Sequence, residues 1–129
     1  MAEVVWLLEE TVRAINSRQI SEHGGRPGIR DEGLLLSALA RPQNLAAYGD
    51  PPPDLAALAA SYAFGIAGNH PFIDGNKCVA LVATRTFLLI NGADLVATQE
   101  EKYVSFLRLA EGGLSEDELA EWIRVRTKQ

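Results

Sequence analysis

The chain has 129 residues, a length that predicts one domain spanning residues 1–129. Apolar residues make up 47% and charged residues 22% of the sequence, and these proportions exclude a disordered chain. Acidic residues outnumber basic ones by 17 to 12, and the net charge of −5 argues against direct nucleic-acid binding through a basic face.

The N-terminal residues predict an amphipathic helix followed by a sharp break. Apolar residues recur at steps of three and four from Val4 to Ile15, which favours a helix over residues 2–20. Glycines and a proline are concentrated in residues 21–28, and these residues cannot continue a helix without cost. We therefore expect the helix to end there.

Two more helices are expected before the middle of the chain. A short helix should cover residues 32–40 and stop near Pro42, because proline lacks the backbone N–H that a helix needs. Residues 41–53, which contain three consecutive prolines, then form a loop. Asp54 stands in N-cap position before a helix over residues 55–68.

The next predicted helix is apolar on nearly every side. It should run over residues 76–90 and end at Asn91-Gly92, a pair typical of helix C-termini. A helix without a polar face is a buried one, so we expect it at the centre of the fold. Residues 94–97 are the one candidate strand and are too short to found a sheet.

The last two helices carry capping boxes in the sequence. Ser/Thr followed three residues later by Glu occurs at Thr98–Glu101 and at Ser115–Glu118, with Gly112-Gly113 between the two helices. Trp122 and Ile123 should anchor the final helix in the core. The pattern as a whole predicts a single all-α bundle of about six helices.

Neither a membrane span nor a secretion signal is expected. The longest apolar stretch, Cys78 to Ile90, contains Arg85 and is shorter than the ~20 residues of a membrane span. Glu3 follows closely on Met1, unlike the start of a signal peptide. The single cysteine leaves no internal disulfide and fits a reducing compartment, so we expect a cytoplasmic protein.

Residues 69–77 concentrate the side chains that carry chemistry, directly before the apolar helix. A glycine-containing turn that leads into a helix start favours phosphate binding, to which Lys77 adds a point charge. Asp74 is a candidate ligand for a divalent cation. His70 is the side chain here that takes a proton near neutral pH, and Phe72 should anchor the loop in the core.

Each of these residues also has a more ordinary interpretation. A lone loop histidine is more often structural than catalytic, and this applies to His23 as well as to His70. Residues 74–76, Asp-Gly-Asn, are most often a turn with a helix cap. Lys77 alone would be a solvated charge. The ordered set is far more specific than any of its members.

Residues 70–77, His-Pro-Phe-Ile-Asp-Gly-Asn-Lys, resemble the signature of the Fic/Doc family in its death-on-curing (Doc) toxin branch. Residues 23–33, with a Gly-Gly-x-Pro-Gly run and Asp-x-Gly, are similar to a second Doc feature. The length and the apolar helix ending in Asn-Gly also match. The resemblance covers nearly the whole chain. It implies a compact Fic/Doc-like helical bundle whose motif loop precedes a buried central helix.

The resemblance implies a phosphotransferase. Fic relatives that transfer AMP carry Gly-Asn-Gly-Arg and a further arginine three residues on, whereas this chain has Lys77 and Leu81 at those positions. Doc-like proteins share the lysine. They move the γ-phosphate of ATP onto a threonine of elongation factor Tu, which blocks translation.

By this resemblance each residue of the loop has an expected role. His70 is the general base on the target hydroxyl, and Asp74 orients the reacting groups or holds Mg²⁺. The residues expected to contact the nucleotide are Phe72, Gly75, Asn76, Lys77 and Cys78.

The resemblance also implies a Phd-like antitoxin as partner. Many Fic proteins inhibit themselves through a Ser/Thr-x-x-x-Glu-Gly/Asn helix. The Glu-Gly pairs here are at residues 32–33 and 111–112, and Gly28 and Leu107 stand four residues before the two glutamates. Because neither is Ser or Thr, inhibition is expected in trans, by an antitoxin tail that folds onto a helix-lined groove.

Two positions depart from the family pattern. Cys78 stands where relatives have an arginine that grips phosphate, so the chain is either a degenerate copy or carries a substitution selected against toxicity. Leu36 stands where relatives commonly have an acidic residue, and it is either a departure that affects function or merely an extra core residue. The alternatives to a weakened kinase are a Fic-type AMP transferase and a catalytically dead nucleotide- or antitoxin-binding remnant.

Overall fold

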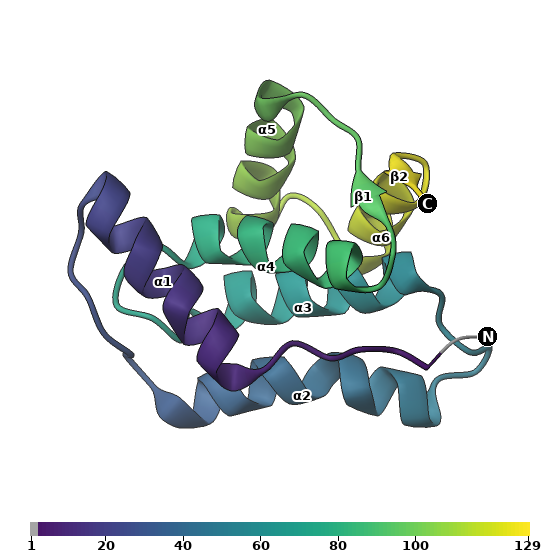
Figure 1. The fold of residues 1–129 in the computed structure, drawn as a ribbon, viewed down its shortest axis with the longest axis horizontal. Coiled ribbons are helices and arrows are strands. Elements are labelled where there is room, and N and C mark those ends of the chain that lie inside the picture. The colour runs from purple at the N-terminus through teal and green to yellow at the C-terminus, as the bar shows by residue number, and fades with distance from the viewer. Residues whose placement is uncertain (1–2) are drawn as a thin grey trace.

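Six helices and one pair of short strands form the part of the chain that the computed structural model describes, residues 3–129 (Figure 1). In chain order the elements are α1 (Glu9–His23), α2 (Glu32–Tyr48), α3 (Leu55–Asn69), α4 (Asn76–Ile90), β1 (Asp94–Leu95), α5 (Gln99–Ala110), α6 (Glu116–Arg124) and β2 (Thr127–Lys128). The predicted all-α fold of about six helices is confirmed.

Helices α3 and α4 form the centre of the bundle (Figure 1). α2, α5 and α6 all pack against α3, and α1 packs against α4. Tyr62 of α3 and Phe87 of α4 are fully buried with ring centroids 4.9 Å apart, so aromatic contact joins the two helices. Burial also raises the pKa of the Tyr62 hydroxyl.

The two central helices differ in how deeply they are buried. α3 is enclosed over most of its length by the helices around it. α4 is buried along one face, through residues such as Val79 and Ala83, while Leu89 and Ile90 in its last turn are exposed. α4 therefore carries more apolar side chains than its contacts with the core bury.

The N-terminal segment is extended as far as Leu8, so the prediction of a helix over residues 2–20 is wrong for its first part. α1 begins at Glu9, and residue 2 lies outside the described residues. Leu7 is 6% exposed and Leu8 is 63% exposed, which is the alternation of an extended chain rather than of a helix face.

Contacts with distant residues explain the extended start. The Asn91 side chain donates to the carbonyl of Val5 over 2.9 Å and accepts from the N–H of Val5 over 2.8 Å. The Leu7 N–H donates to the Tyr62 hydroxyl over 3.2 Å. These bonds take the place of helical ones, and no local pattern in the sequence reveals them.

Helix α2 continues through Pro42, so the predicted stop after residues 32–40 and a loop beginning at residue 41 are wrong. A proline in a helix interior costs about 3 kcal/mol. The cost is offset because Leu39 and Pro42 are buried and Leu45 packs against the same core, a stripe at helical spacing. Packing on α3 thus overrides the local preference.

The second half of the chain follows the prediction closely. The capping boxes of Thr98 with Glu101 and of Ser115 with Glu118 are both formed. Ile123 is buried and packs with the half-buried ring of Trp122 against the core.

The predicted starts of α3 and α4 are likewise confirmed, as is the C-terminal end of α4. The prediction of the strands needs correction. Asn91 is the C-cap of α4 and Gly92 follows with φ +81°. β1 is shorter than residues 94–97 and pairs antiparallel with β2, whose residues showed no strand pattern.

Leu36 lies on the surface of α2 with 51% of its side chain exposed. Its interpretation as an extra core residue is therefore wrong. None of the helices in residues 3–129 has both the length and the apolar character that crossing a bilayer requires.

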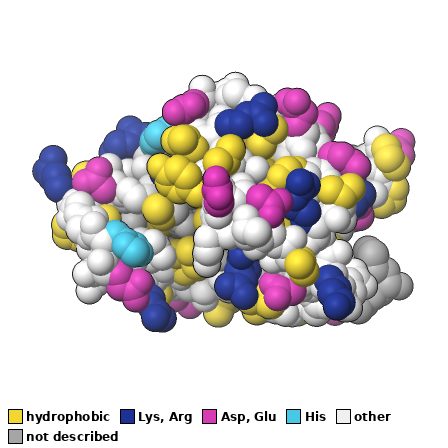
Figure 2. Space-filling model, turned by 90° about the horizontal axis from the view of Figure 1, so that it is seen from above, with side chains coloured by type: hydrophobic (Ala, Val, Ile, Leu, Met, Phe, Trp, Pro, Cys, Tyr) yellow, Lys and Arg dark blue, Asp and Glu magenta, His cyan; other side chains and the backbone are white. Residues whose placement is uncertain are grey.

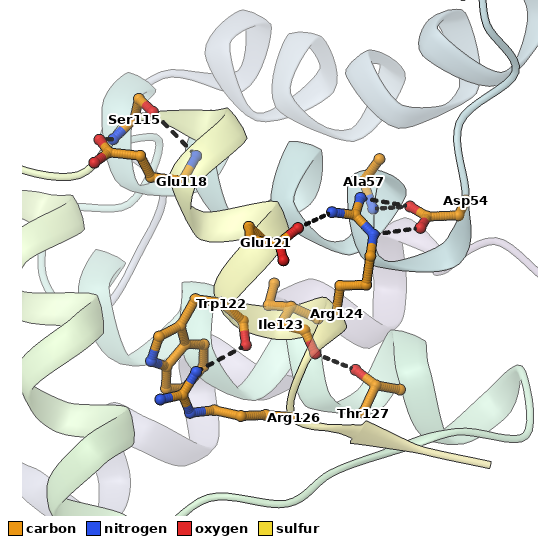
Figure 3. A network of polar contacts seen from close by, with 10 residues as sticks. All are labelled: Asp54, Ala57, Ser115, Glu118, Glu121, Trp122, Ile123, Arg124, Arg126 and Thr127. Atoms are coloured by element: carbon orange, nitrogen blue, oxygen red, sulfur yellow. Dashed lines mark hydrogen bonds and ion pairs between the residues drawn. The ribbon is translucent and has the colours of Figure 1, made fainter.

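A polar network joins the start of α3 to the end of α6 (Figure 3). The Arg124 guanidinium donates to both oxygens of Asp54, over 2.6 and 3.1 Å, and to Glu121 over 2.6 Å. Asp54 also caps α3 by accepting the N–H of Ala57 over 2.9 Å. The hydrogen bond from Arg124 is the main cause that lowers the pKa of Asp54 below its ordinary value of 3.8.

We expect Asp54→Asn to reduce the free energy of unfolding near neutral pH by about 0.2–1 kcal/mol, because asparagine keeps the cap but loses the ion pair. A carboxylate whose pKa is lowered on folding stabilises the fold above its unfolded pKa. That contribution disappears as the pH falls through the folded pKa. The difference between variant and parent should therefore shrink below pH 3.8.

Urea unfolding at neutral pH and at about pH 2.5 measures this difference. Glu3→Gln is the matched control, since Glu3 is exposed and has no ion pair in the described chain. A difference that persists unchanged at low pH would assign the effect to packing rather than to charge.

Candidate functional site

The motif loop, residues 70–75, joins α3 to α4 at the end of the bundle where the connection from α1 to α2 also lies (Figure 1). The two loops are paired through their backbones. The N–H groups of Arg30 and Asp31 donate to the Pro71 carbonyl over 2.7 and 3.1 Å, and the Ile73 N–H donates to Gly28 over 3.1 Å. The two segments that carry the family-like motifs therefore form one unit.

His70 is held in an unusual backbone conformation. It ends α3 with φ 50° and ψ 54°, and it is the one non-glycine residue among those described with a positive φ. The Arg30 guanidinium donates to the carbonyls of His70 and Asn69 over 2.7 and 2.8 Å. These bonds fix the strained turn and leave the imidazole exposed. Nothing in the local sequence around Arg30 signalled this contact.

Asn76 ties the motif loop to the start of α4. Its side chain accepts the Phe72 N–H over 3.0 Å and donates to the Phe72 carbonyl over 2.9 Å. The Phe72 ring is 1% exposed, so the prediction that it anchors the loop in the core is confirmed. The sequence also predicts that Phe72 contacts a nucleotide, but the buried ring has no exposed surface for such a contact. The Asn76 side chain likewise positions the loop, which leaves its backbone N–H for a ligand.

Asn76→Ala should lower the free energy of unfolding by about 1–3 kcal/mol, because it removes two hydrogen bonds and leaves buried backbone groups of Phe72 without partners. Urea unfolding followed by circular dichroism measures the change. Asn44→Ala, on the exposed face of α2, is the control and should be nearly neutral. Equal effects of the two substitutions would mean that Asn76 does not hold the loop.

Asp74 is fixed through both its backbone and its carboxylate. Oδ2 accepts the Arg26 N–H over 2.7 Å, and the backbone carbonyl accepts the buried Asn16 amide over 3.0 Å. The connection approaches closely here, since a Cβ on Gly25 would lie 3.3 Å from the Asp74 Cβ. One carboxylate oxygen is then left for another partner. Sequence reasoning missed Asn16, which lies within an apparently ordinary amphipathic helix.

The residues present fit Mg²⁺ only together with a phosphate. Residues 3–129 contain no group of three or more His, Cys, Asp or Glu side chains placed to hold a metal ion. Asp74 offers a single carboxylate. Mg²⁺ is commonly held in proteins by one or two carboxylates, the phosphates of the substrate and water.

The first turn of α4 has N–H groups that are not capped within the described residues. Gly75 precedes it with φ +86°, a left-handed conformation that glycine adopts without strain, and no side chain within residues 3–129 caps the helix. α2, α3, α5 and α6 each have a side-chain cap, and α1 has acidic residues in its first turn. The N–H groups of residues 76–78 consequently have no acceptor among the described residues.

Lys77 and Cys78 follow directly on this first turn. The Lys77 Nζ lies 4.3 Å from the centroid of the Tyr103 ring on α5, a cation–π contact that holds the half-buried lysine against that helix. Cys78 is a free, half-buried thiol. The lysine therefore carries its positive charge beside α5, whereas the thiol carries none.

His23 takes no part in the motif loop. Its side chain is 66% exposed at the end of α1, with Nε2 3.9 Å from Glu22. Figure 2 shows the two histidines of the chain at the same end of the molecule, with apolar side chains nearby on this face. His23 therefore lies outside the candidate site, although the connection that follows it is paired with the motif loop.

Together these features define an all-α protein in which an exposed, positioned histidine precedes a helix start whose first N–H groups lack acceptors within residues 3–129. A sequence model described as the Fic/DOC family matches residues 6–88, more than half of the chain. The protein belongs to the Fic/DOC family.

Two relatives carry names from the Doc branch. The chain is 46% identical to "Toxin Doc" of Mycolicibacterium smegmatis (strain ATCC 700084 / mc(2)155) over 74 residues, which are 57% of this chain and 57% of that protein. It is 34% identical to "Protein kinase doc" of Escherichia phage P1 over 91 residues, which are 70% of this chain and 71% of that protein. The match thus spans little more than half of the first relative.

Proposed function

We propose that this single Fic/Doc-like domain is the toxin of a toxin–antitoxin pair. In this proposal it is a cytoplasmic kinase that blocks translation by moving the γ-phosphate of ATP onto a threonine of elongation factor Tu. Family membership and the names of the two relatives support the toxin and kinase parts. The observation that carries the proposal is the exposed His70, fixed beside a helix start whose first three N–H groups have no acceptor in the described part of the chain.

In the proposed reaction His70 takes the proton of the threonine hydroxyl. The threonine oxygen forms a bond to the γ-phosphorus, the bond from phosphorus to the bridging oxygen breaks, and ADP leaves with that electron pair. The N–H groups of residues 76–78 and the Lys77 charge stabilise the phosphate oxygens.

Asp74 has an orienting role in the same proposal. Its Oδ2 is occupied by the Arg26 N–H, so Oδ1 remains to orient the reacting groups or to bind Mg²⁺. Bound Mg²⁺ would neutralise negative charge on the phosphates. Asp74 is suited to this role because hydrogen bonds hold both its backbone and its carboxylate.

Control of the activity is proposed to come from a Phd-like antitoxin. The chain has no Ser/Thr-x-x-x-Glu-Gly segment of the self-inhibiting kind. A partly disordered antitoxin tail that folds against the helices would supply the inhibition. If a segment of this chain were found to inhibit it fully, this part of the proposal would be wrong.

Incubation of the chain with elongation factor Tu and ATP labelled at either the α or the γ position tests the proposal. Transfer of the γ label supports the kinase, whereas transfer of the α label would identify an AMP transferase. Lys77 and Leu81 disfavour the second outcome. Absence of both labels would identify a non-catalytic binding remnant, the alternative that Cys78 favours.

A further inference from the structure

The backbone of His70 is held by a side chain from the connection between α1 and α2, that of Arg30. The guanidinium donates through Nε to the His70 carbonyl over 2.7 Å and through Nη2 to the Asn69 carbonyl over 2.8 Å. These carbonyls lie at the C-terminal end of α3, where the last carbonyl groups of a helix lack helical partners and the helix dipole is negative. A guanidinium is suited to this end, because its planar fork places two donors on neighbouring acceptors.

Arg30 is itself fixed by the start of α2. Its backbone N–H donates to the Pro71 carbonyl over 2.7 Å. The next residue, Asp31, caps α2 by accepting the N–H of Leu34 over 3.0 Å. The Asn69 side chain donates to the Leu34 carbonyl over 3.0 Å, which joins the end of α3 to the same turn of α2. The guanidinium therefore extends from a backbone that is tied both to α2 and to the motif loop.

His70 adopts a conformation that a histidine keeps only with support from its surroundings. Its φ of 50° and ψ of 54° lie in the left-handed region, which disfavours residues with a Cβ atom. The direction of the Cα–Cβ bond, and with it the position of the imidazole, depends on this conformation. The side chain is exposed, so packing of the ring does not fix it. Hydrogen bonds to the backbone are thus the means by which the fold places the imidazole.

We propose that Arg30 is a positioning residue for His70, an inference that rests on the proposed function. Without the two bonds from the guanidinium, the turn relaxes toward negative φ, and the imidazole moves away from the hydroxyl whose proton it takes. The start of α4 is held separately, because Asn76 ties the loop to that helix through Phe72. Arg30 should therefore affect the rate of transfer and not the affinity for ATP.

Replacing Arg30 by methionine tests the proposal, because methionine keeps an aliphatic stem and removes every donor. The kcat for transfer of the γ-phosphate should fall about 10–100-fold, since a displacement of about 1 Å at a reacting group can cost about 10²-fold. The affinity for ATP, measured by calorimetric titration, should change less than about twofold. Arg26→Met is the matched control and should keep the parent kcat. Arg26 is an exposed arginine of the same connection, and its bond to Asp74 comes from the backbone N–H.

A spectroscopic measurement tests the positioning without turnover. Without an affinity tag the chain contains two histidines, so the imidazole signals in a proton–carbon NMR spectrum are those of His23 and His70. Arg30→Met should shift or broaden the His70 signals and leave those of His23 unchanged. If the parent transfers no phosphate, the proposed function fails, and the His70 signals alone decide this inference.

Arg30→Lys covers the case in which Arg30→Met fails to fold. Lysine keeps the positive charge but not the planar fork, so its kcat should lie below that of the parent. A change in the His70 signals of this variant cannot come from loss of charge. The inference is wrong if an active parent and Arg30→Met have the same kcat, or if kcat and ATP affinity fall by the same factor. It is also wrong if the His70 signals are the same in the parent and the variants.

Discussion

Replacing His70 by alanine should reduce phosphoryl transfer to elongation factor Tu by about 10²–10⁴-fold, the usual contribution of a positioned general base. Nucleotide affinity should stay nearly unchanged, because the base acts on the incoming hydroxyl while the start of α4 binds the phosphates. Single-turnover rates with labelled ATP, together with calorimetric titration of the nucleotide, measure the two quantities separately.

The backbone at His70 calls for a second variant at the same position. Its φ of 50° is strained for alanine, whereas asparagine adopts this region more readily. His70→Asn should therefore lose the rate while keeping the loop intact. His23→Ala, at the exposed histidine of α1, is the control and should keep full activity. An equal loss of binding and turnover would mark His70 as a structural residue.

Cys78→Arg should raise the transfer rate about 10–100-fold. A charge-assisted hydrogen bond contributes about 1.5–3 kcal/mol, and each 1.36 kcal/mol in the barrier is a factor of ten. An arginine there grips phosphate bidentately, which a thiol cannot do. Transfer to elongation factor Tu and growth arrest on expression, compared for the two forms side by side, measure the gain.

An uncharged substitution at position 78 separates the effect of the added charge from the effect of removing the thiol. Cys78→Ser should leave the rate unchanged, because it restores no positive charge at the helix start. Circular dichroism melting should give similar stabilities for all three forms, since the residue is only half-buried. If the parent chain already matches the arginine variant in rate, the phosphate clamp depends on Lys77 and not on position 78.

The helices that could be predicted are those whose ends are marked by residues nearby in the sequence. Asp54, Thr98 and Ser115 each accept a backbone N–H three residues on, and each of these three helices begins where the sequence indicated. Prediction failed for residues 3–8 and for the helix through Pro42. There the deciding contacts come from α3 and α4, which are distant in sequence.

The candidate site likewise contains residues that could be predicted from the sequence and residues that could not. The helix start at Asn76 and the burial of Phe72 were predictable, because a loop that precedes an apolar helix is a local pattern. Arg30 and Asn16 were not, since their partners lie 40 and 58 residues away and neither residue interrupts a local pattern. The roles of the loop residues in catalysis stay predictions.

Asparagine side chains fasten both ends of α4, Asn76 to Phe72 and Asn91 to Val5. Backbone amides inside such a helix should exchange with deuterium only through large openings of the fold. The amides of residues 76–78 are an exception, because they lack acceptors among residues 3–129 and should exchange orders of magnitude faster. An anion seated at the helix start would slow those three amides selectively. Deuterium exchange at three positions thus reports occupancy without turnover, whether or not the chain transfers phosphate.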